Sequence, residues 1–145
     1  MHASFFTAGL VALAAIVSVV SGQTLPAGCD RNITVQSGDT CNAISATHNV
    51  STYQLAAVNS GIIDPACDNL FVGEVVCLGI TGQDCNVTQV MQTGDTCYSV
   101  ANAAGIPINT LLANNPNVNT ICTNVYPGEV LCTASQIYVN ITYSG

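Results

Sequence analysis

The hexamers "QSGDTC" at residues 36–41 and "QTGDTC" at residues 92–97 decide the fold, because they mark an internal repeat. With an offset of 56 positions up to the middle of each copy, and 55 beyond it, cysteines, glycines and apolar residues recur in register. The cysteines of the first copy are Cys29, Cys41, Cys67 and Cys77, and those of the second are Cys85, Cys97, Cys122 and Cys132. A period this long indicates two copies of one small module rather than a solenoid.

The repeat sets the domain boundaries. We predict modules at residues 29–78 and 85–133, a glycine-containing linker "GITGQD" at 79–84, and a short tail at 134–145. Modules of this size bury little apolar surface, so we expect disulfide bonds to supply part of their stability.

The N-terminus carries an uninterrupted apolar run at residues 5–20, followed by small residues. This pattern predicts a signal peptide over residues 1–22 and an exported protein. A membrane anchor is the alternative, but the run is shorter than the roughly 20 residues of a membrane span. The tail also lacks the apolar stretch of a lipid-anchor signal. We therefore expect no membrane association after cleavage.

The eight cysteines all follow this leader, and an even number in a small exported chain predicts disulfides. A metal site is the alternative, but there is no Cys-x-x-Cys pair, and we expect neither a metal nor a cofactor. Each module allows three pairings. If Val76 and Leu78 face the helices, Cys77 faces outward and lies near Cys29. That arrangement favours Cys29–Cys77 and leaves Cys41 for Cys67.

Charged residues are sparse. Eight acidic residues and one arginine give a formal net charge of −7. This composition argues against binding to nucleic acid or to an anionic membrane surface, since both require clustered lysine and arginine. Four N-glycosylation sequons predict surface glycans, and they begin at Asn32, Asn49, Asn86 and Asn140.

Each module has the same sequence of local signals. β-branched residues at 33–36 and 88–92 predict a strand, and the glycine–aspartate turn then leads to an N-cap at Asp39 or Thr40 and at Asp95 or Thr96. We predict that the first helix ends at Asn49 or Gly105. A second helix is predicted from Ser51 or Pro107 to Asn59 or Asn115, before a strand at 74–78 or 129–133. The fold class is α+β, with an antiparallel two-stranded sheet and two helices on one face of each βααβ module.

These motifs resemble the LysM domain, and in particular the cysteine-rich form found in secreted fungal LysM effectors. The resemblance covers nearly all of residues 29–133. It implies a non-enzymatic protein that binds chitin, in a shallow groove between the strand-to-helix loop and the helix-to-strand loop. The implied ligand-binding residues are Gly38, Asp39, Thr40, Asn59, Ser60, Gly61, Ile62 and Ile63 in the first module, and Gly94, Asp95, Thr96, Asn115, Pro116, Asn117 and Val118 in the second.

N-acetylglucosamine is neutral, so a charged pocket is not needed. Loop backbone can meet its acetamide N–H and C=O, and the apolar side chain of Ile62, Ile63 or Val118 can contact its methyl group. The resemblance further implies that the protein hides chitin fragments from host receptors or shields wall chitin from chitinases. Ligand-induced dimers or polymers are an open possibility. The alternatives are a structural wall protein and an adhesin that binds peptidoglycan or other glycans.

Two further features have competing interpretations. Glu74 and Glu129 recur next to glycine and could pair with Asp39 and Asp95 as in a glycosidase, which needs two carboxylates about 5–10 Å apart. We expect these carboxylates to be exposed and without a cleft that raises a pKa, and we predict no enzymatic activity. The aromatic residues Phe71 and Tyr126 are interpreted as packing residues rather than as sugar-stacking residues.

Overall fold

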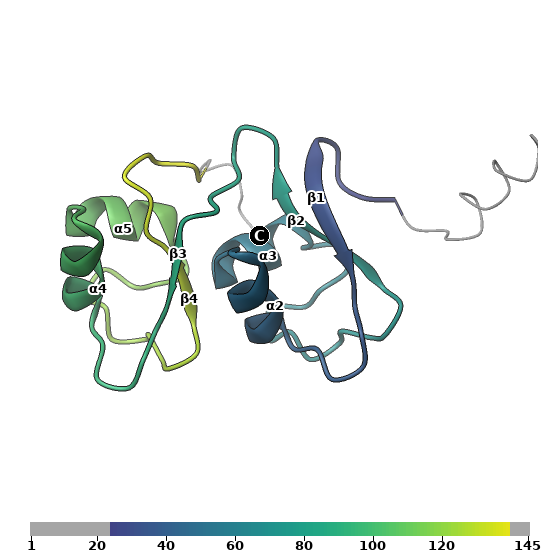
Figure 1. The fold of residues 1–145 in the computed structure, drawn as a ribbon, viewed down its shortest axis with the longest axis horizontal. Coiled ribbons are helices and arrows are strands. Elements are labelled where there is room, and N and C mark those ends of the chain that lie inside the picture. The colour runs from purple at the N-terminus through teal and green to yellow at the C-terminus, as the bar shows by residue number, and fades with distance from the viewer. Residues whose placement is uncertain (1–23, 140–145) are drawn as a thin grey trace, which may run out of the picture.

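The computed structural model describes residues 24–139 (Figure 1), so the predicted signal peptide and Asn140 lie outside the described residues. The first module contains β1 (Cys29–Thr34), α2 (Cys41–His48), α3 (Thr52–Val58) and β2 (Val75–Ile80). The second contains β3 (Thr88–Val90), α4 (Cys97–Ala104), α5 (Ile108–Asn114) and β4 (Val130–Cys132). The predicted βααβ order is confirmed in both copies.

The helix boundaries follow from capping residues. Thr40 and Thr96 are the N-caps of α2 and α4, and their hydroxyl groups accept hydrogen bonds from the backbone N–H of the third helical residue. The left-handed C-caps are Asn49 and Gly105, with φ of 54° and 71°, as predicted. Pro107 was expected to be the first helical residue, but it occupies the N-cap position and α5 begins one residue later.

Both sheets are antiparallel pairs. β1 pairs with β2, and their register includes Ile33 opposite Val76. β3 pairs with β4, and their register includes Gln89 opposite Leu131. Each module has its own apolar core, built around Leu55 in the first and Leu111 in the second, and both of these side chains are 1% exposed.

All eight cysteines form disulfide bonds, and every bond stays within one module. The pairings are Cys29–Cys77, Cys41–Cys67, Cys85–Cys132 and Cys97–Cys122, which confirms the favoured connectivity. Cys77 was expected to face outward, but it is fully buried. One bond of each module ends on the last strand: it starts from Cys29 on β1 in the first module and from Cys85, three residues before β3, in the second. The other bond joins the start of the first helix to the long loop that follows the second helix.

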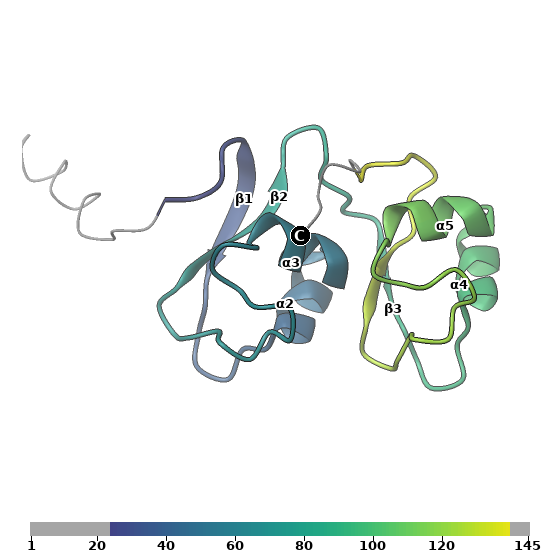
Figure 2. The same ribbon diagram turned by 180° about the vertical axis from the view of Figure 1, so that it is seen from behind.

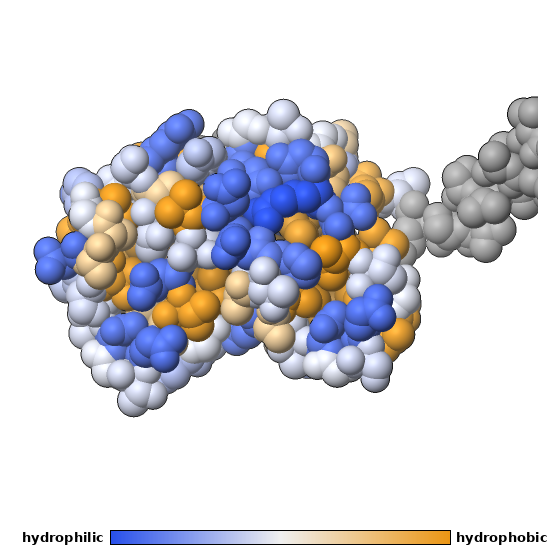
Figure 3. All heavy atoms as spheres, in the orientation of Figure 1, coloured by the Kyte–Doolittle hydropathy of each residue, from blue (hydrophilic) through white to orange (hydrophobic). Residues whose placement is uncertain are grey.

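The two modules lie next to each other along the long axis of the molecule and have the same orientation (Figures 1 and 2). In Figures 1 and 2 the helices α2 and α3 of the first module face the sheet of the second, while α4 and α5 lie at one end of the molecule and β1–β2 at the other. Apolar and polar side chains are intermixed over the face shown in Figure 3. Within residues 24–139, no helix has both the length and the apolar character needed to cross a membrane.

The predicted linker at 79–84 is not a free tether. Its first two residues belong to β2, and the carboxylate of Asp84 forms a bidentate ion pair with Arg31 at 2.7 Å for each oxygen. Arg31 also donates to the backbone carbonyls of His48 and Asn49 at the end of α2. The only Lys or Arg side chain of the protein thus joins the linker to the end of a helix.

Gln54 on α3 completes this anchor. Its amide group donates to Asp84 at 2.8 Å and to the carbonyl of Leu78 at 2.7 Å, and it accepts from the N–H of Cys85 at 3.0 Å. Burial by itself would raise the pKa of Asp84, but the hydrogen bonds from Arg31 and Gln54 outweigh burial and hold that pKa below its usual value. These bonds hold the start of the second module against the first, and they help to fix the surface between the modules.

Candidate functional site

The glycine–aspartate turns are shaped by their own side chains. Gly38 and Gly94 have φ of +89° and +91°, a left-handed conformation that glycine adopts without steric cost. A carboxylate oxygen of Asp39 accepts from the N–H of Gln36 at 2.8 Å, and Asp95 does the same in the second module at 2.9 Å. The aspartates therefore brace their turns, and they leave the exposed glycine backbone available to a ligand.

Asn59 and Asn115, which the resemblance places among the ligand-binding residues, make buried hydrogen bonds within their own modules. Asn115 is fully buried. Its amide group donates to the carbonyls of Leu111 and Cys132 at 2.7 and 2.8 Å and accepts from the N–H of Cys132 at 2.8 Å. Asn59 makes the equivalent bonds in the first module. Each asparagine ties the end of a helix to the last strand.

Two of the apolar residues expected at the acetamide methyl group are also core residues. Ile63 and Val118 are 3% and 6% exposed and pack inside their own modules. Ile62 is 39% exposed and lies beside Gly61 in a separate hollow near the start of the described chain. With Ile62, the members of the second loops whose side chains are exposed are Ser60, Pro116 and Asn117.

The two glutamates are buried, which corrects the expectation that they are exposed. Glu74 and Glu129 are 3% and 2% accessible. Glu129 accepts from the amide of Asn117 at 2.9 Å. Burial raises the pKa of Glu129, although hydrogen bonds from the Tyr126 backbone and from Asn117 oppose the rise. Both glutamates also accept a weak bond from the backbone N–H three residues earlier, so they hold the loop before the last strand.

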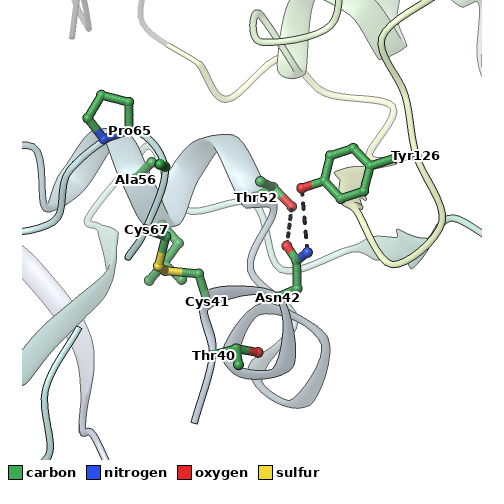
Figure 4. Close-up of a pocket in the computed structure, with 10 residues that line it drawn as sticks. Thr40, Cys41, Asn42, Thr52, Ala56, Pro65, Cys67 and Tyr126 are labelled. Carbon is green, nitrogen blue, oxygen red and sulfur yellow. Dashed lines mark hydrogen bonds between the residues drawn. A yellow bond between two sulfur atoms is a disulfide. The ribbon is translucent and has the colours of Figure 1, made fainter. Parts of the chain in front are cut away.

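A contact between the modules is formed by residues that the repeat alone does not single out. The N–H of Val130 on β4 donates to the hydroxyl of Thr52 at 2.9 Å. Asn42 lies 3.5 Å from the hydroxyl of Tyr126 and accepts from Thr52 at 3.4 Å. Figure 4 shows Tyr126 reaching across from the second module toward Asn42 and Thr52. Phe71 and Tyr126, interpreted as packing residues, are in fact 60% and 42% exposed.

A groove runs along α3 where the modules meet. One part has a volume of about 400 Å³ and lies between the start of α2, the loop at 65–67 and Tyr126. The other part has about 330 Å³ and lies between α3 and the loop that carries Pro116. The two parts share Ala56 and Pro65 in their walls, so they adjoin each other.

The groove brings together predicted ligand-binding residues from both modules. They are Thr40, Ser60 and Ile63 from the first module, and Pro116 and Asn117 from the second. The disulfide Cys41–Cys67 forms part of the wall. The prediction missed Asn42, Thr52, Pro65 and Tyr126. The sequence feature that pointed to Tyr126 was an aromatic residue that recurs two positions before each Gly-Glu pair.

The remaining predicted residues do not line this groove. Gly94 and Asp95 line a smaller hollow of about 190 Å³ beside Tyr126 and Pro127. Gly38, Asp39 and Thr96 lie at turns outside the groove walls. The two modules therefore differ, because in the first module the end of the turn forms part of the intermodule groove.

Three sequons can be located. The side chains of Asn32, Asn49 and Asn86 are exposed. Asn32 lies on β1 and Asn49 at the end of α2. Their glycosylation remains a prediction.

Comparison with known proteins agrees with this architecture. The profile named "LysM domain" matches residues 33–79 and 90–133. The secreted LysM effector LysM1 of Trichophyton rubrum is 29% identical to the chain, and the alignment covers 72% of the chain and 50% of the relative. The secreted LysM effector LysM2 of Penicillium expansum is also 29% identical, over 74% of the chain and 33% of the relative. A secreted LysM effector of Pochonia chlamydosporia is 30% identical, over 72% and 32%.

The chain spans half or less of the length of these relatives. All three are named as secreted proteins, which supports the predicted extracellular localisation. Among solved structures, the Bacillus cereus spore cortex-lytic enzyme SleL is 20% identical to the chain, and the match covers 72% of the chain and 22% of SleL. Its TM-score of 0.31 is too low to indicate a shared overall structure. Since the profile matches both modules and both have the βααβ order, the chain belongs to the LysM domain family.

Proposed function

We propose that this protein is a secreted, non-enzymatic binding protein for chitin oligomers, and that the oligomer lies in the groove between the two modules. The observation that supports this most strongly is the groove itself. It gathers four exposed predicted ligand-binding residues from both modules, Thr40, Ser60, Pro116 and Asn117, beside the exposed ring of Tyr126. Its two parts, about 400 and 330 Å³, fall within the range of small-molecule sites.

The chemistry of the groove fits a neutral amide-bearing sugar. Ala56, Pro65 and Pro116 give it apolar walls that can contact sugar C–H groups and acetyl methyl groups. Asn42 lines one part and Asn117 the other, so each part contains a side-chain amide that can be a hydrogen-bond partner for hydroxyl and acetamide groups. The protein's single arginine is held in the linker anchor, which agrees with an uncharged ligand.

The groove also explains why two modules are needed. Both modules contribute to each part, with Tyr126 in one and Pro116 and Asn117 in the other, so an oligomer that fills both parts would contact residues of both modules. Individual sugar contacts in a shallow, open site are weak, and affinity requires several units bound together. We infer that short oligomers, which reach only one part of the groove, bind more weakly than a hexamer does.

The biological role follows by analogy with the relatives, whose names describe secreted effectors. We propose that the protein sequesters chitin fragments from host receptors or shields fungal wall chitin from chitinases. A structural role in the producer's own wall uses the same groove, and only a receptor-competition or chitinase-protection assay separates these roles. An adhesin that binds peptidoglycan is a different proposal, and soluble ligands distinguish it directly.

Calorimetry of the mature protein with a chitin hexamer tests the proposal. We expect saturable binding that Tyr126→Ala weakens by about tenfold or more, as for an aromatic anchor at the centre of a contact. Phe71→Ala is the matched control, because Phe71 occupies the aligned position in the first module and does not line the groove. Mass spectrometry of the recovered hexamer should show no cleavage.

Three results would contradict the proposal. The folded wild-type protein could give no heat with the hexamer at millimolar concentration, which would exclude chitin as the ligand. It could bind peptidoglycan fragments in preference to chitin, which would favour the adhesin. If Phe71→Ala and Tyr126→Ala weakened binding equally, the ligand would not be centred on the intermodule groove.

A further inference from the structure

The contact between the modules joins two unlike surfaces. The sheet of the second module packs against the helices α2 and α3 of the first, and each module has the same orientation along the molecule (Figures 1 and 2). Each module therefore has a helix side and a sheet side. The contact uses the helix side of the first module and the sheet side of the second. The helix side of the second module and the sheet side of the first remain at opposite ends of the molecule.

The unused helix side is more apolar than the one that is used. Asn42 touches the second module, and the aligned residue in that module is Tyr98, which is 69% exposed. Ala66 lines the same part of the groove as Tyr126, and its aligned residue is Ile121, which is 76% exposed. Large apolar side chains thus stand at the positions that form the contact in the first module.

The unused sheet side is exposed in the same way. Tyr126 reaches across the contact, and its aligned residue Phe71 is 60% exposed, beside Val72 at 63%. On the outer face of the strands, Val90 of β3 is half-buried, whereas the aligned Thr34 of β1 is exposed. An aromatic residue and an aliphatic residue therefore lie uncovered at each end of the molecule.

We propose that these two ends bind each other in different copies of the chain, so that the sheet end of one molecule docks on the helix end of the next in the way that the two modules dock within one molecule. The occupant of each end is a second copy, because the two ends are the repeat equivalents of the surfaces that meet within one molecule. Tyr98 and Ile108 stand at the positions where Asn42 donates and Thr52 accepts across that contact, so association between copies rests on apolar burial rather than on those hydrogen bonds. Such a contact joins unlike surfaces and does not close on itself, so it produces linear chains of copies. It requires no glycan ligand and is distinct from the intermodule groove.

The sequon at Asn32 gives this association a built-in limit. Asn32 is exposed on β1, and it precedes Thr34 by two positions on the same face of the strand, since side chains in a strand alternate between faces. A glycan there would project from the face that docks. We expect association in protein made without N-glycans, and that form is the one to test.

Sedimentation velocity of the unglycosylated mature chain, up to about 1 mM, measures the association. We expect the sedimentation coefficient to rise with concentration. A sheet-end variant (Phe71→Ser with Val72→Ser) and a helix-end variant (Tyr98→Ser with Ile121→Ser) should each raise the dissociation constant by more than about tenfold. The matched control replaces Val87 and Ile137 with serine. These residues are 51% and 56% exposed and align with no residue of the groove or of the contact between the modules, so the control should associate as the wild type does.

Mixing the two variants is the decisive step. The sheet-end variant keeps an intact helix end, and the helix-end variant keeps an intact sheet end, so an equimolar mixture should form a dimer that grows no further. A monomeric wild type at the highest concentration, or a monomeric mixture when the wild type associates, would overturn the proposal. If either variant by itself associated as strongly as the wild type does, the proposal would also be overturned, because like ends would then be pairing with each other. Circular dichroism confirms that each variant is folded.

Discussion

Replacing Asn115 with alanine should destabilise the second module rather than remove a ligand contact. The change deletes three hydrogen bonds of 2.7–2.8 Å in a site with no solvent exposure. An unpaired buried backbone group costs about 1–3 kcal/mol. Since water can enter the space left by the amide, we take the low end for each of the three groups and expect a loss of about 3 kcal/mol.

This loss is large for a module of this size. At about 0.05–0.15 kcal/mol per residue, the free energy of unfolding of such a module is only about 2–7 kcal/mol. Asn115→Asp keeps the size of the side chain and its acceptor, but it sets a carboxylate oxygen against the carbonyls of Leu111 and Cys132. It should be at least as damaging at neutral pH and less so in acid, where the protonated carboxyl group can donate.

Urea unfolding followed by circular dichroism measures the loss, and amide hydrogen exchange locates it. The N–H of Cys132 bonds to the Asn115 side chain, so it should lose protection first. Asn109→Ala on the exposed face of α5 is the control and should change stability by less than about 0.5 kcal/mol. If Asn115→Ala unfolded within about 1 kcal/mol of the wild type but bound chitin less tightly, Asn115 would be a ligand residue and our reasoning would fail.

Three further predictions concern buried groups. Gly79→Ala should lower the melting temperature and weaken the linker anchor, because an added Cβ would lie 2.2 Å from Cγ of Asp84; unchanged stability would argue against that close contact. Ser45→Ala should stabilise the first module by about 1 kcal/mol in urea unfolding, since the Ser45 hydroxyl is buried without a partner and the aligned residue is Ala101. The pKa of Glu129 is raised in the folded state, so its contribution to stability is present below its unfolded pKa and is lost as pH rises through the folded pKa. Glu129→Gln should therefore flatten the decline in melting temperature over that pH range, and a parallel curve would refute the assignment.

Much of the fold could be predicted from local signals. The turn glycines, the threonine N-caps and the left-handed positions Asn49 and Gly105 act within a few residues, so their effect can be judged without knowing the rest of the structure. The disulfide pairing also followed, because an antiparallel sheet brings the first strand beside the last. The repeat supported each of these predictions by showing the same signal twice.

The site could be predicted only in part, because burial depends on residues far apart in the chain. Asn59 and Asn115 resemble loop residues until the last strand presents its backbone to them. Glu74 and Glu129 were expected to be exposed, yet the loop before each last strand encloses them. Polar residue type alone does not distinguish a ligand contact from a buried hydrogen bond.

The two modules, their βααβ order and their covalent connections follow from local sequence, since they depend on caps, turns and cysteines that recur at fixed spacing. Only the tertiary structure decided how the modules face each other. That arrangement depends on the ion pair between Arg31 and Asp84 and on the contact of Tyr126 with Asn42, and both join residues more than 50 positions apart. Neither pair carries a local signal, because a single charged or aromatic residue specifies no partner until folding brings one within reach.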